Sequence, residues 1–486
     1  MAAVAAVLAL GACGAAAGSR VPARFQSQAG AVAAVPDGNW TRFDFTAQRS
    51  GVGPAQTGIT SATLPRLGRR TIELDGTVDS SAIQLHGVKV AGLRRDVVVL
   101  NTTYGRAIAL DPGSGRLLWQ FTPHDISSYE GGPQITQATP VADPDDRYVY
   151  SLSPDGYAHK LDVTTGRQLW ATRVTWDPTR EKVDQLNLSG RWLIVTTGGY
   201  NGDGPVYQGH VVLIDRQSGR VAHVWNSLCS ARRHLIHPPS SCPASDSAIW
   251  ARAGAVVEPG SHDLLVATGN GPFNDFTDWG DSVLELNPTL RLLGHWTPVN
   301  QRQLDQTDGD LGSTAPALLP GGLAVQGGKS GVLWLLSLQR LHPTTGQGGH
   351  GLGGALQTIP TPGGSHMLTA PVVWQHGGRA WLFVATDGGT NAYVLGTDRR
   401  LHVRWRDPTP GTSPVLAGGL LYVYDEVDGV LKVLNPLKGN VLDSLAAAPG
   451  HWNSPIVIGG RIILPVGNGD DQATTGRLFI YHLPGR

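Results

Sequence analysis

The sequence is poor in charge and in the residues that build long helices. Charged residues make up 16% of the 486 residues, below the roughly 25% of typical domains, and 38 basic side chains balance 38 acidic ones. Proteins that bind nucleic acid need a basic excess or a basic stripe, so that class is disfavoured. Beyond the first twenty residues, no long capped run of Ala, Leu, Glu and Lys occurs, which disfavours a helical protein.

Cysteine is scarce, and the sequence motifs of several enzyme classes are missing. Only Cys13, Cys229 and Cys242 are present, without a CxxCH motif for c-type haem or a CxxC pair for zinc. Twelve residues separate Cys229 from Cys242, so this pair is a candidate for a small disulfide in an oxidising compartment. No nucleophile elbow, P-loop, HExxH or Rossmann fingerprint occurs, which disfavours hydrolase and nucleotide chemistry.

The N-terminus is apolar but too short to span a membrane. The run MAAVAAVLAL has the length of a signal peptide, and the LGAC that ends at Cys13 resembles the lipobox of bacterial lipoproteins. We therefore expect a lipoprotein signal peptide over residues 1–13, with Cys13 lipidated, and a flexible tether over residues 14–36. The protein is expected to be exported, and either lipid-anchored at the outer face of the cytoplasmic membrane or secreted. The alternative is an Ala-rich signal that ends at a cysteine by chance, because no Lys or Arg precedes the apolar run.

Glycine and hydrophobic residues are abundant. The 64 glycines amount to about twice the average usage, and they punctuate the chain with 33 prolines every few residues. Turns are therefore frequent and the elements between them short. Hydrophobic residues reach 41%, which is enough to bury a large core.

A repeat runs through the chain after the N-terminal segment. A β-rich run is followed by Asp or Asn, then Gly, then Trp about four residues later. The alternating apolar run predicts a strand, the D-x-x-T/S-G predicts a tight turn, and the Trp is expected on the next strand, packed between neighbouring units. The copies with both turn and Trp are AIALDPGSGRLLW, AHKLDVTTGRQLW and VVLIDRQSGRVAHVW, and weaker ones end at Trp296 and Trp405.

The repeat predicts an all-β fold, an eight-bladed β-propeller with four antiparallel strands in each blade. We place the units near residues 79–123, 134–175, 187–228, 247–298, 312–360, 368–408, 411–449 and 452–484, within one domain over residues 37–486. The last unit lacks its outer strand, and Arg69–Leu74 is the candidate that completes it and closes the ring, which removes an exposed sheet edge. Seven blades is the rival count, because the fifth unit is degenerate.

The D-x-x-T-G-x-x-x-W repeat resembles the tryptophan-docking motif of the quinoprotein superfamily. That superfamily contains PQQ-dependent alcohol dehydrogenases and also non-catalytic propellers, including a lipoprotein scaffold of outer-membrane assembly. The resemblance covers most of the chain after residue 37, and it implies the fold more strongly than an activity. The family's dehydrogenases hold PQQ on the propeller axis, with Ca²⁺ bound to a carboxylate, an Asn and a catalytic Asp.

Two segments resemble the metal-binding parts of that site. LLVATGNGPFND, from Leu264, resembles the family segment Y-x-G-T-G-N-P, which makes Asn270 a candidate Ca²⁺ ligand. The alternative is a strand-end turn at this Asn-Gly pair. For the family's carboxylate ligand, Asp203 is the nearest match, although the family uses a Glu followed by an R-G pair and Gln208-Gly209 stands here.

The segment LDQTDGDLGSTAPALL, from Leu304, resembles the part of the family that carries the catalytic Asp. Asp308 takes that position, as catalytic base and metal ligand, and Asp310 is its rival as the catalytic residue. Three carboxylates within six residues repel one another unless a cation or water screens them. The alternative is a solvated acidic loop.

The cofactor itself is expected to contact a lysine and a tryptophan. AVQGGKSGVLWLL, from Ala324, resembles the K/R-x-G-x-x-Y signature of the family and makes Lys329, one of only six lysines, the candidate contact of the quinone carbonyls. Trp250 and Trp279 are candidates to stack on a planar cofactor. The alternatives are an exposed lysine before a turn and tryptophans that pack between blades. The family's disulfide between adjacent cysteines above PQQ has no counterpart here.

Two classes of function remain open. The first is a PQQ- and Ca²⁺-dependent oxidoreductase that acts on a small-molecule alcohol or sugar and needs a separate electron acceptor. The second is a non-catalytic scaffold that binds protein partners at the cell envelope. The degenerate fifth unit, the missing Glu and the missing cysteine pair favour the second; the ordered series Asn270, Asp308, Lys329 favours the first slightly.

Overall fold

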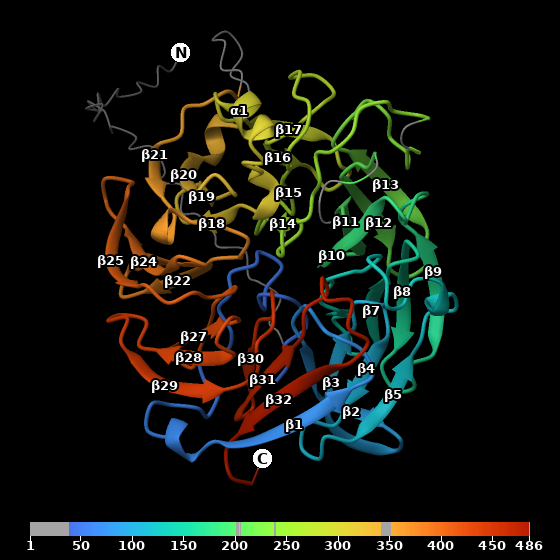
Figure 1. Ribbon diagram of the computed structural model, residues 1–486, viewed down its shortest axis with the longest axis vertical. Coiled ribbons are helices and arrows are strands. Elements are labelled where there is room, and N and C mark those ends of the chain that lie inside the picture. The colour runs from blue at the N-terminus through green and yellow to red at the C-terminus, as the bar shows by residue number, and fades with distance from the viewer. Residues whose placement is uncertain (1–37, 201–203, 205, 238–239, 342–350, 486) are drawn as a thin grey trace, which may run out of the picture.

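The computed structural model describes residues 38–200, 204, 206–237, 240–341 and 351–485. Within this part of the chain, eight four-stranded antiparallel sheets stand around a central axis, which confirms the eight-bladed propeller (Figure 1). The segments predicted as a signal peptide and a tether, including Cys13, lie outside the described residues, and so does Asp203.

Each blade is a meander of four strands, numbered here from blade 1 to blade 8 along the chain. The strands of blades 1 to 4 are β2 (Ile83–Val90), β3 (Leu93–Asn101), β4 (Ala107–Leu110) and β5 (Leu117–Phe121); β6 (Val141–Ala142), β7 (Tyr148–Ser153), β8 (Tyr157–Asp162) and β9 (Gln168–Arg173); β10 (Glu181–Ser189), β11 (Trp192–Gly199), β12 (His210–Asp215) and β13 (Val221–Asn226); and β14 (Val256–Val257), β15 (Leu264–Ala267), β16 (Val283–Leu286) and β17 (Leu292–Trp296). The third unit begins at β10, a few residues before its predicted start.

The second half of the ring repeats this plan. The strands of blades 5 to 8 are β18 (Ala317–Leu319), β19 (Leu323–Gln326), β20 (Val332–Ser337) and β21 (Gln357–Pro360); β22 (Val372–His376), β23 (Arg379–Thr386), β24 (Gly389–Leu395) and β25 (Leu401–Asp407); β26 (Val415–Ala417), β27 (Leu420–Asp425), β28 (Val430–Leu434) and β29 (Val441–Ala446); and β30 (Ile456–Ile458), β31 (Arg461–Val466), β32 (Gly476–His482) and β1 (Gly68–Leu74). The degenerate fifth unit therefore forms a complete blade.

The ring closes as the sequence predicts. Strand β1, which contains Arg69–Leu74, pairs antiparallel with β32 over its whole length, from Gly68 opposite His482 to Leu74 opposite Gly476. The first strand of the chain thus becomes the outer strand of the last blade. Without it, the outer edge of β32 would be left unpaired.

Helices are few and short in the described residues. They are α1 (Gln301–Gln306) and the 3-10 turns η1 (Leu64–Arg66), η2 (Ile126–Ser128), η3 (Leu311–Ser313), η4 (Leu338–Arg340) and η5 (Pro362–Gly364). None of the helices described here has the length and the apolar composition that crossing a bilayer requires.

Tryptophans fill the spaces between blades, as the repeat predicts. A Cβ added at Gly166 would lie 2.6 Å from the ring of Trp119, and one at Gly439 would lie 2.6 Å from the ring of Trp405. The indole nitrogen of Trp119 donates to Val163 O of the next blade at 2.6 Å. The turn glycines are needed because their φ angles are positive and because the indole lies against the space that a side chain would take.

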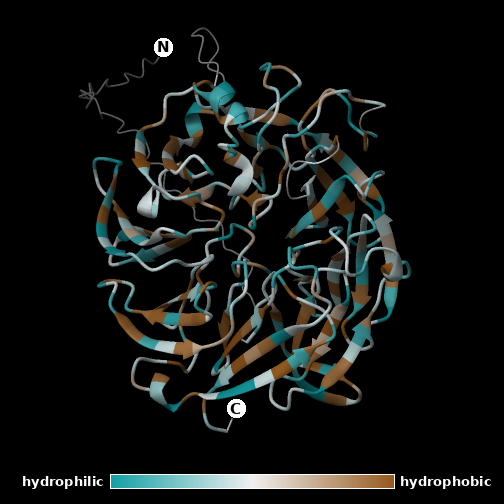
Figure 2. Cartoon of the chain, viewed as in Figure 1, coloured by the Kyte–Doolittle hydropathy of each residue, from teal (hydrophilic) through white to brown (hydrophobic). Residues whose placement is uncertain are grey.

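The core lies between the blades, where apolar strand faces of neighbouring sheets meet (Figure 2). One buried cluster, for example, joins Ile83 and Val99 of blade 1 to Val149 and Leu161 of blade 2. Most inner strands are buried on both sides, so their sequences read as continuous apolar runs.

The segment before β1 closes one end of the axis. The O of Thr41 accepts from Ala142 N of blade 2, the O of Ala47 from Val257 N of blade 4, and the O of Thr57 from Gly460 N of blade 8. Gly460 lies in the turn between β30 and β31, at the end of the blade opposite to the turn between β31 and β32. The loops of the candidate site, described next, lie at the other end of the axis.

Candidate functional site

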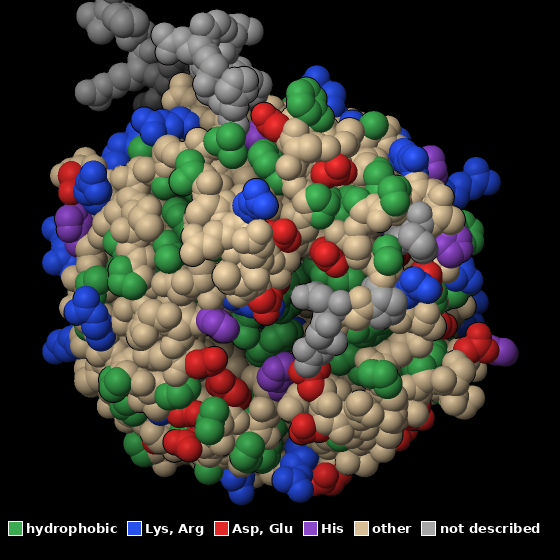
Figure 3. Space-filling model, turned by 45° about the horizontal axis from the view of Figure 1, so that its top comes forward, with side chains coloured by type: hydrophobic (Ala, Val, Ile, Leu, Met, Phe, Trp, Pro, Cys, Tyr) green, Lys and Arg blue, Asp and Glu red, His purple; other side chains and the backbone are tan. Residues whose placement is uncertain are grey.

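A cavity of about 400 Å³ opens on the axis at the face opposite the N-terminal segment. In Figure 3 the surface is hollowed near its centre, with acidic side chains around the rim. Its walls come mainly from loops that follow the second or the fourth strand of a blade, which all lie at one end of the sheets; Lys182, at the start of β10, adds to them. The lining residues with functional side chains are Gln137, Lys182, Tyr200, Tyr207, Trp250, Asp308, Asp310, Lys329, Trp452, Asp470 and Gln472.

Lys329 and the two candidate catalytic aspartates meet in this cavity. Lys329 follows β19, whereas Asp308 and Asp310 lie in the connection from blade 4 to blade 5. The Nζ of Lys329 donates to Asp308 Oδ1 at 2.7 Å and lies 3.4 Å from Asp310 Oδ2. Burial of the ammonium opposes its charge, but the two carboxylates outweigh burial and raise the pKa of Lys329. The lysine therefore stays charged at neutral pH.

Asn270 joins the same cluster from the turn after β15. Its Nδ2 donates to Asp308 Oδ1 at 2.9 Å, and its Oδ1 accepts from Asp310 N at 3.0 Å. The backbone N–H contact fixes the orientation of the amide, because only the oxygen can accept from it. The structure thus brings Asn270, Asp308, Asp310 and Lys329 together, as the resemblance implies for its site residues.

Asp308 and Asp310 differ in their surroundings. Asp310 is nearly buried, and it accepts from Gly312 N at 3.0 Å and from Trp250 Nε1 at 3.0 Å. The side chain of Asp308 is 59% exposed, and both of its hydrogen bonds are made by Oδ1. Oδ2 of Asp308 is therefore open to a ligand, whereas Asp310 positions the Trp250 ring.

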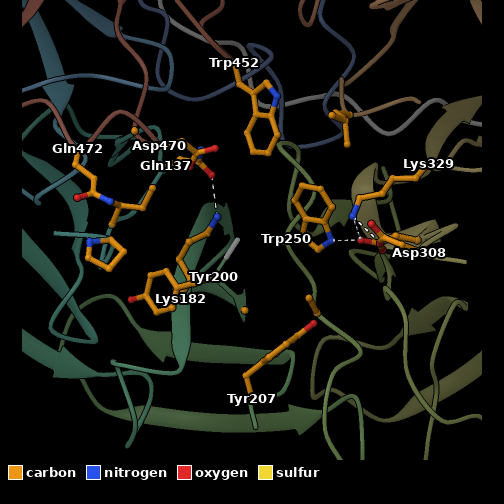
Figure 4. Close-up of a pocket in the computed structure, with 17 residues that line it drawn as sticks. Gln137, Lys182, Tyr200, Tyr207, Trp250, Asp308, Lys329, Trp452, Asp470 and Gln472 are labelled. Carbon is orange, nitrogen blue, oxygen red and sulfur yellow. Dashed lines mark hydrogen bonds and ion pairs between the residues drawn. The ribbon is translucent and has the colours of Figure 1, made fainter. Parts of the chain in front are cut away.

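Of the two candidate tryptophans, only Trp250 lines the cavity. The ammonium of Lys329 lies 5.3 Å from the centre of the Trp250 ring. The centres of the Trp250 and Trp452 rings are 5.7 Å apart. In Figure 4, Trp250 stands between Lys329 and Lys182. Trp279 is buried elsewhere in blade 4, where its Nε1 donates to Ser230 Oγ at 2.9 Å.

A second cation faces the cavity from blade 3. Lys182 donates to Gln137 Oε1 at 2.8 Å, and its Nζ lies 3.0 Å from Asp184 Oδ1. Burial raises the pKa of Asp184 to about 7, although Lys182 and Arg252 oppose that shift. The repeat motif gives no signal for Lys182, because it lies on an inner strand without a motif of its own.

A partly buried histidine and a buried aspartate connect the loops beside the cavity. Asp79 Oδ2 lies 2.7 Å from His451 Nδ1 and accepts from Gln137 Nε2 at 2.9 Å. His451 stacks on Trp452, with ring centres 4.4 Å apart. The guanidinium of Arg252 donates to the backbone oxygen of Trp452 at 3.0 Å. The network joins blades 1, 2, 4 and 8 at the axis.

The disulfide predicted from the sequence is present. Cys229 and Cys242 are bonded, with their Cα atoms 6.2 Å apart. The loop that they close belongs to the connection from blade 3 to blade 4, and Arg232 and Arg233 are exposed on it. Leu228, just before the loop, and Ile236, within it, are buried in one apolar cluster.

Four-stranded blades, tryptophan–glycine packing between several of them and a polar axial cavity define an eight-bladed β-propeller. Residues 68–227 match the family model described as outer membrane protein assembly factor BamB. No curated protein matches the chain in sequence.

Solved structures share the fold at low sequence identity. The quinohemoprotein alcohol dehydrogenase from Comamonas testosteroni is 14% identical, with a TM-score of 0.64 over 94% of this chain and 82% of that one. A europium-containing methanol dehydrogenase is 14% identical, with a TM-score of 0.67 over 92% of this chain and 98% of that one. BamB from Moraxella catarrhalis is 14% identical, with a TM-score of 0.50 over 85% of this chain and 99% of that one. The predicted resemblance is thus confirmed for the fold.

Proposed function

We propose that the protein is a PQQ- and Ca²⁺-dependent oxidoreductase that acts on an alcohol or a sugar. The observation that carries the proposal is the cluster of Asn270, Asp308 and Lys329 beside the face of Trp250, on the axis of a quinoprotein-type propeller. The fold alone does not imply this chemistry, since the same fold occurs in scaffolds.

The cavity suits a planar, anionic cofactor in size and in its walls. A volume of about 400 Å³ lies within the range of small-molecule sites. The Trp250 ring offers a flat apolar wall, and Lys329 and Lys182 offer two cations to carboxylate or carbonyl oxygens of the cofactor. These features support PQQ as the group that the cavity takes.

The charge of the lining supports a divalent cation beside the cofactor. Two lysines and three aspartates line the cavity, so an anionic cofactor alone would meet a formal excess of negative charge. Oxygen ligands are the donors that Ca²⁺ prefers, and Asn270 Oδ1 and Asp308 are the described residues that would hold it. Asp203 is the further carboxylate that we propose from its place in the sequence.

The chain's residues then have separate tasks. When bound with its cation, PQQ would supply a quinone that takes a hydride, and with it two electrons, from the carbon of an alcohol. Asp308 Oδ2 accepts the hydroxyl proton of the substrate, because that oxygen is open to the cavity. Lys329 holds the carboxylate of Asp308 in place. Asp310 fixes the Trp250 ring through the indole N–H.

The proposal includes export of the protein across the cytoplasmic membrane. The apolar N-terminus and Cys13 support a protein that is lipid-anchored outside the cytoplasmic membrane or secreted. The disulfide agrees with an oxidising compartment. Electrons have to leave through a separate acceptor, since the sequence has no CxxCH for a covalently bound c-type haem.

The test is a dehydrogenase assay with the mature chain, PQQ, Ca²⁺ and an artificial electron acceptor, over a panel of alcohols and sugars. The proposal expects turnover that needs both PQQ and Ca²⁺ and that drops in Asp308→Asn. Absence of turnover over the panel, in a protein that binds neither PQQ nor Ca²⁺, would contradict it.

A non-catalytic scaffold at the cell envelope is the second candidate. The family model over residues 68–227, described as an assembly factor, favours it. The mutual hydrogen bonds among Asn270, Asp308 and Lys329 favour it as well, because these groups satisfy one another without a ligand. This candidate predicts that Lys329→Met leaves every biological readout unchanged.

A further inference from the structure

The space between blades 5 and 6 lacks the tryptophan that three other blades carry at the equivalent position. In blades 3, 4 and 6, the tryptophan of the fourth, outer strand lies opposite a residue of the third strand. That residue is four positions before the first residue of the turn that joins the two strands. These pairs are Trp225 with Val211, Trp296 with Val283, and Trp405 with Ala392. The corresponding residue of blade 5 is Leu333, four positions before Ser337, and its partner on β21 is Ile359. An isoleucine therefore stands where these blades have tryptophan.

A cavity lies beside this isoleucine. A space of about 390 Å³ lies between β21 of blade 5 and strands β24 and β25 of blade 6, which are neighbours in Figure 1. Ile359, Leu401 and Val403 contribute its apolar wall. By comparison, an engineered apolar cavity of about 150 Å³ is enough to bind benzene. The space is thus large enough for an aromatic ring system.

Polar groups at the edge of this cavity select a charged ligand. Arg406 lines it, is exposed, and makes no hydrogen bond or ion pair with any residue that the structure describes. Tyr393 also lines it, and its hydroxyl oxygen accepts from Asn391 Nδ2 at 3.0 Å, which leaves the hydroxyl hydrogen for a ligand. A guanidinium and a phenol hydroxyl suit a carboxylate.

We propose that the cavity between blades 5 and 6 is a binding site for a small planar aromatic carboxylate. The ring takes the place that an indole occupies between other blades, against Ile359, Leu401 and Val403. The carboxylate binds Arg406 and receives the hydroxyl hydrogen of Tyr393. The site is distinct from the axial cavity, with which it shares no lining residue.

The test is isothermal titration calorimetry of the full chain with indole-3-acetate, with neutral 3-methylindole as the comparison. We expect binding of indole-3-acetate with a Kd below about 1 mM, and of 3-methylindole about tenfold more weakly. Arg406→Gln should weaken the binding of indole-3-acetate until its affinity is close to that of 3-methylindole. Ile359→Trp, which fills the cavity from within, should abolish binding.

Two further variants keep the test decisive. Lys329→Gln removes a cation from the axial cavity and should leave the affinity for indole-3-acetate unchanged. Val403→Glu places a carboxylate at the exposed edge of the cavity and should abolish binding, even if Ile359→Trp does not fold. No heat with millimolar indole-3-acetate, unchanged affinity in folded Ile359→Trp or in Val403→Glu, or loss of binding in Lys329→Gln would overturn the proposal.

Discussion

Lys329 and Asp308 are joined across two loops of the propeller face, with Nζ 2.7 Å from Oδ1. The lysine holds one oxygen of the carboxylate and leaves the other open to the cavity. An ammonium that contacts two carboxylates neutralises an acidic loop and at the same time fixes its shape. The contact explains how Asp308 and Asp310 are tolerated side by side at the axis.

The two aspartates should differ in their effect on turnover. Asp308→Asn removes the proton acceptor and one proposed Ca²⁺ ligand, and should lower kcat of the PQQ-loaded protein by about 10²- to 10⁴-fold. Asp310→Asn should act mainly on PQQ affinity, because Asp310 positions Trp250. Steady-state kinetics and PQQ titration of both variants measure the difference. If kcat falls in Asp310→Asn and not in Asp308→Asn, Asp310 is the proton acceptor instead of Asp308.

Tryptophans between blades should carry much of the stability. Trp405 is nearly buried against the next blade, where its indole N–H donates to Pro436 O at 2.8 Å. Trp405→Ala should lower the free energy of unfolding by about 3–5 kcal/mol. Trp176, which is 52% exposed, is the matched control, and its alanine variant should change stability by about 0.5 kcal/mol or less. Denaturant titration compares the two, and equal losses would argue against the packing role.

Stability should depend on pH through Asp79 and His451. Burial opposes the charge of His451, but Asp79 outweighs burial and raises the pKa of His451. A histidine with a raised pKa in the folded state contributes stability that is complete below about pH 6.5 and is lost as the pH rises through the folded value. The free energy of unfolding should therefore fall as the pH rises above about 6.5 in the native protein.

His451→Gln keeps a hydrogen-bond donor for Asp79 but cannot titrate, so it should flatten that part of the pH profile. Denaturant titrations at a series of pH values give the slope for both proteins. The expectation fails if the variant retains the full slope.

The disulfide should protect the loop that it closes. A loop of this size contributes about 3 kcal/mol in the chain-entropy account, so reduction should lower the free energy of unfolding by a similar amount. It should also speed tryptic cleavage at Arg232 or Arg233, which are exposed within the loop. The double variant Cys229→Ser, Cys242→Ser should behave as the reduced protein does. Unchanged cleavage would show that Leu228 and Ile236 alone hold the loop.

Much of the ring could be predicted because its signals are local. The glycine and tryptophan of each repeat lie close in sequence, and the contacts they make depend only on the next repeat. The strand around Ile72 was predictable for a different reason, since the last unit was one strand short. The position of Ile359 was not, because the sequence between β20 and β21 has lost the repeat motif.

The cavity was predictable only where a motif marked its residues. Asn270, Asp308 and Lys329 followed from segments that resemble a family. Lys182 and Trp452 carry no such pattern, because they meet Trp250 only after the ring has closed and brought distant blades together. Trp279 was indistinguishable from Trp250 in sequence, and burial within blade 4 separates them.

The most direct test of the central claim is titration of PQQ into the purified chain from about residue 37, with and without Ca²⁺, followed by tryptophan fluorescence. The account predicts quenching that requires Ca²⁺ and that is lost in Asn270→Ala and in Lys329→Ala. No quenching by high-micromolar PQQ, or quenching that persists in both variants, would contradict a quinone site on the axis.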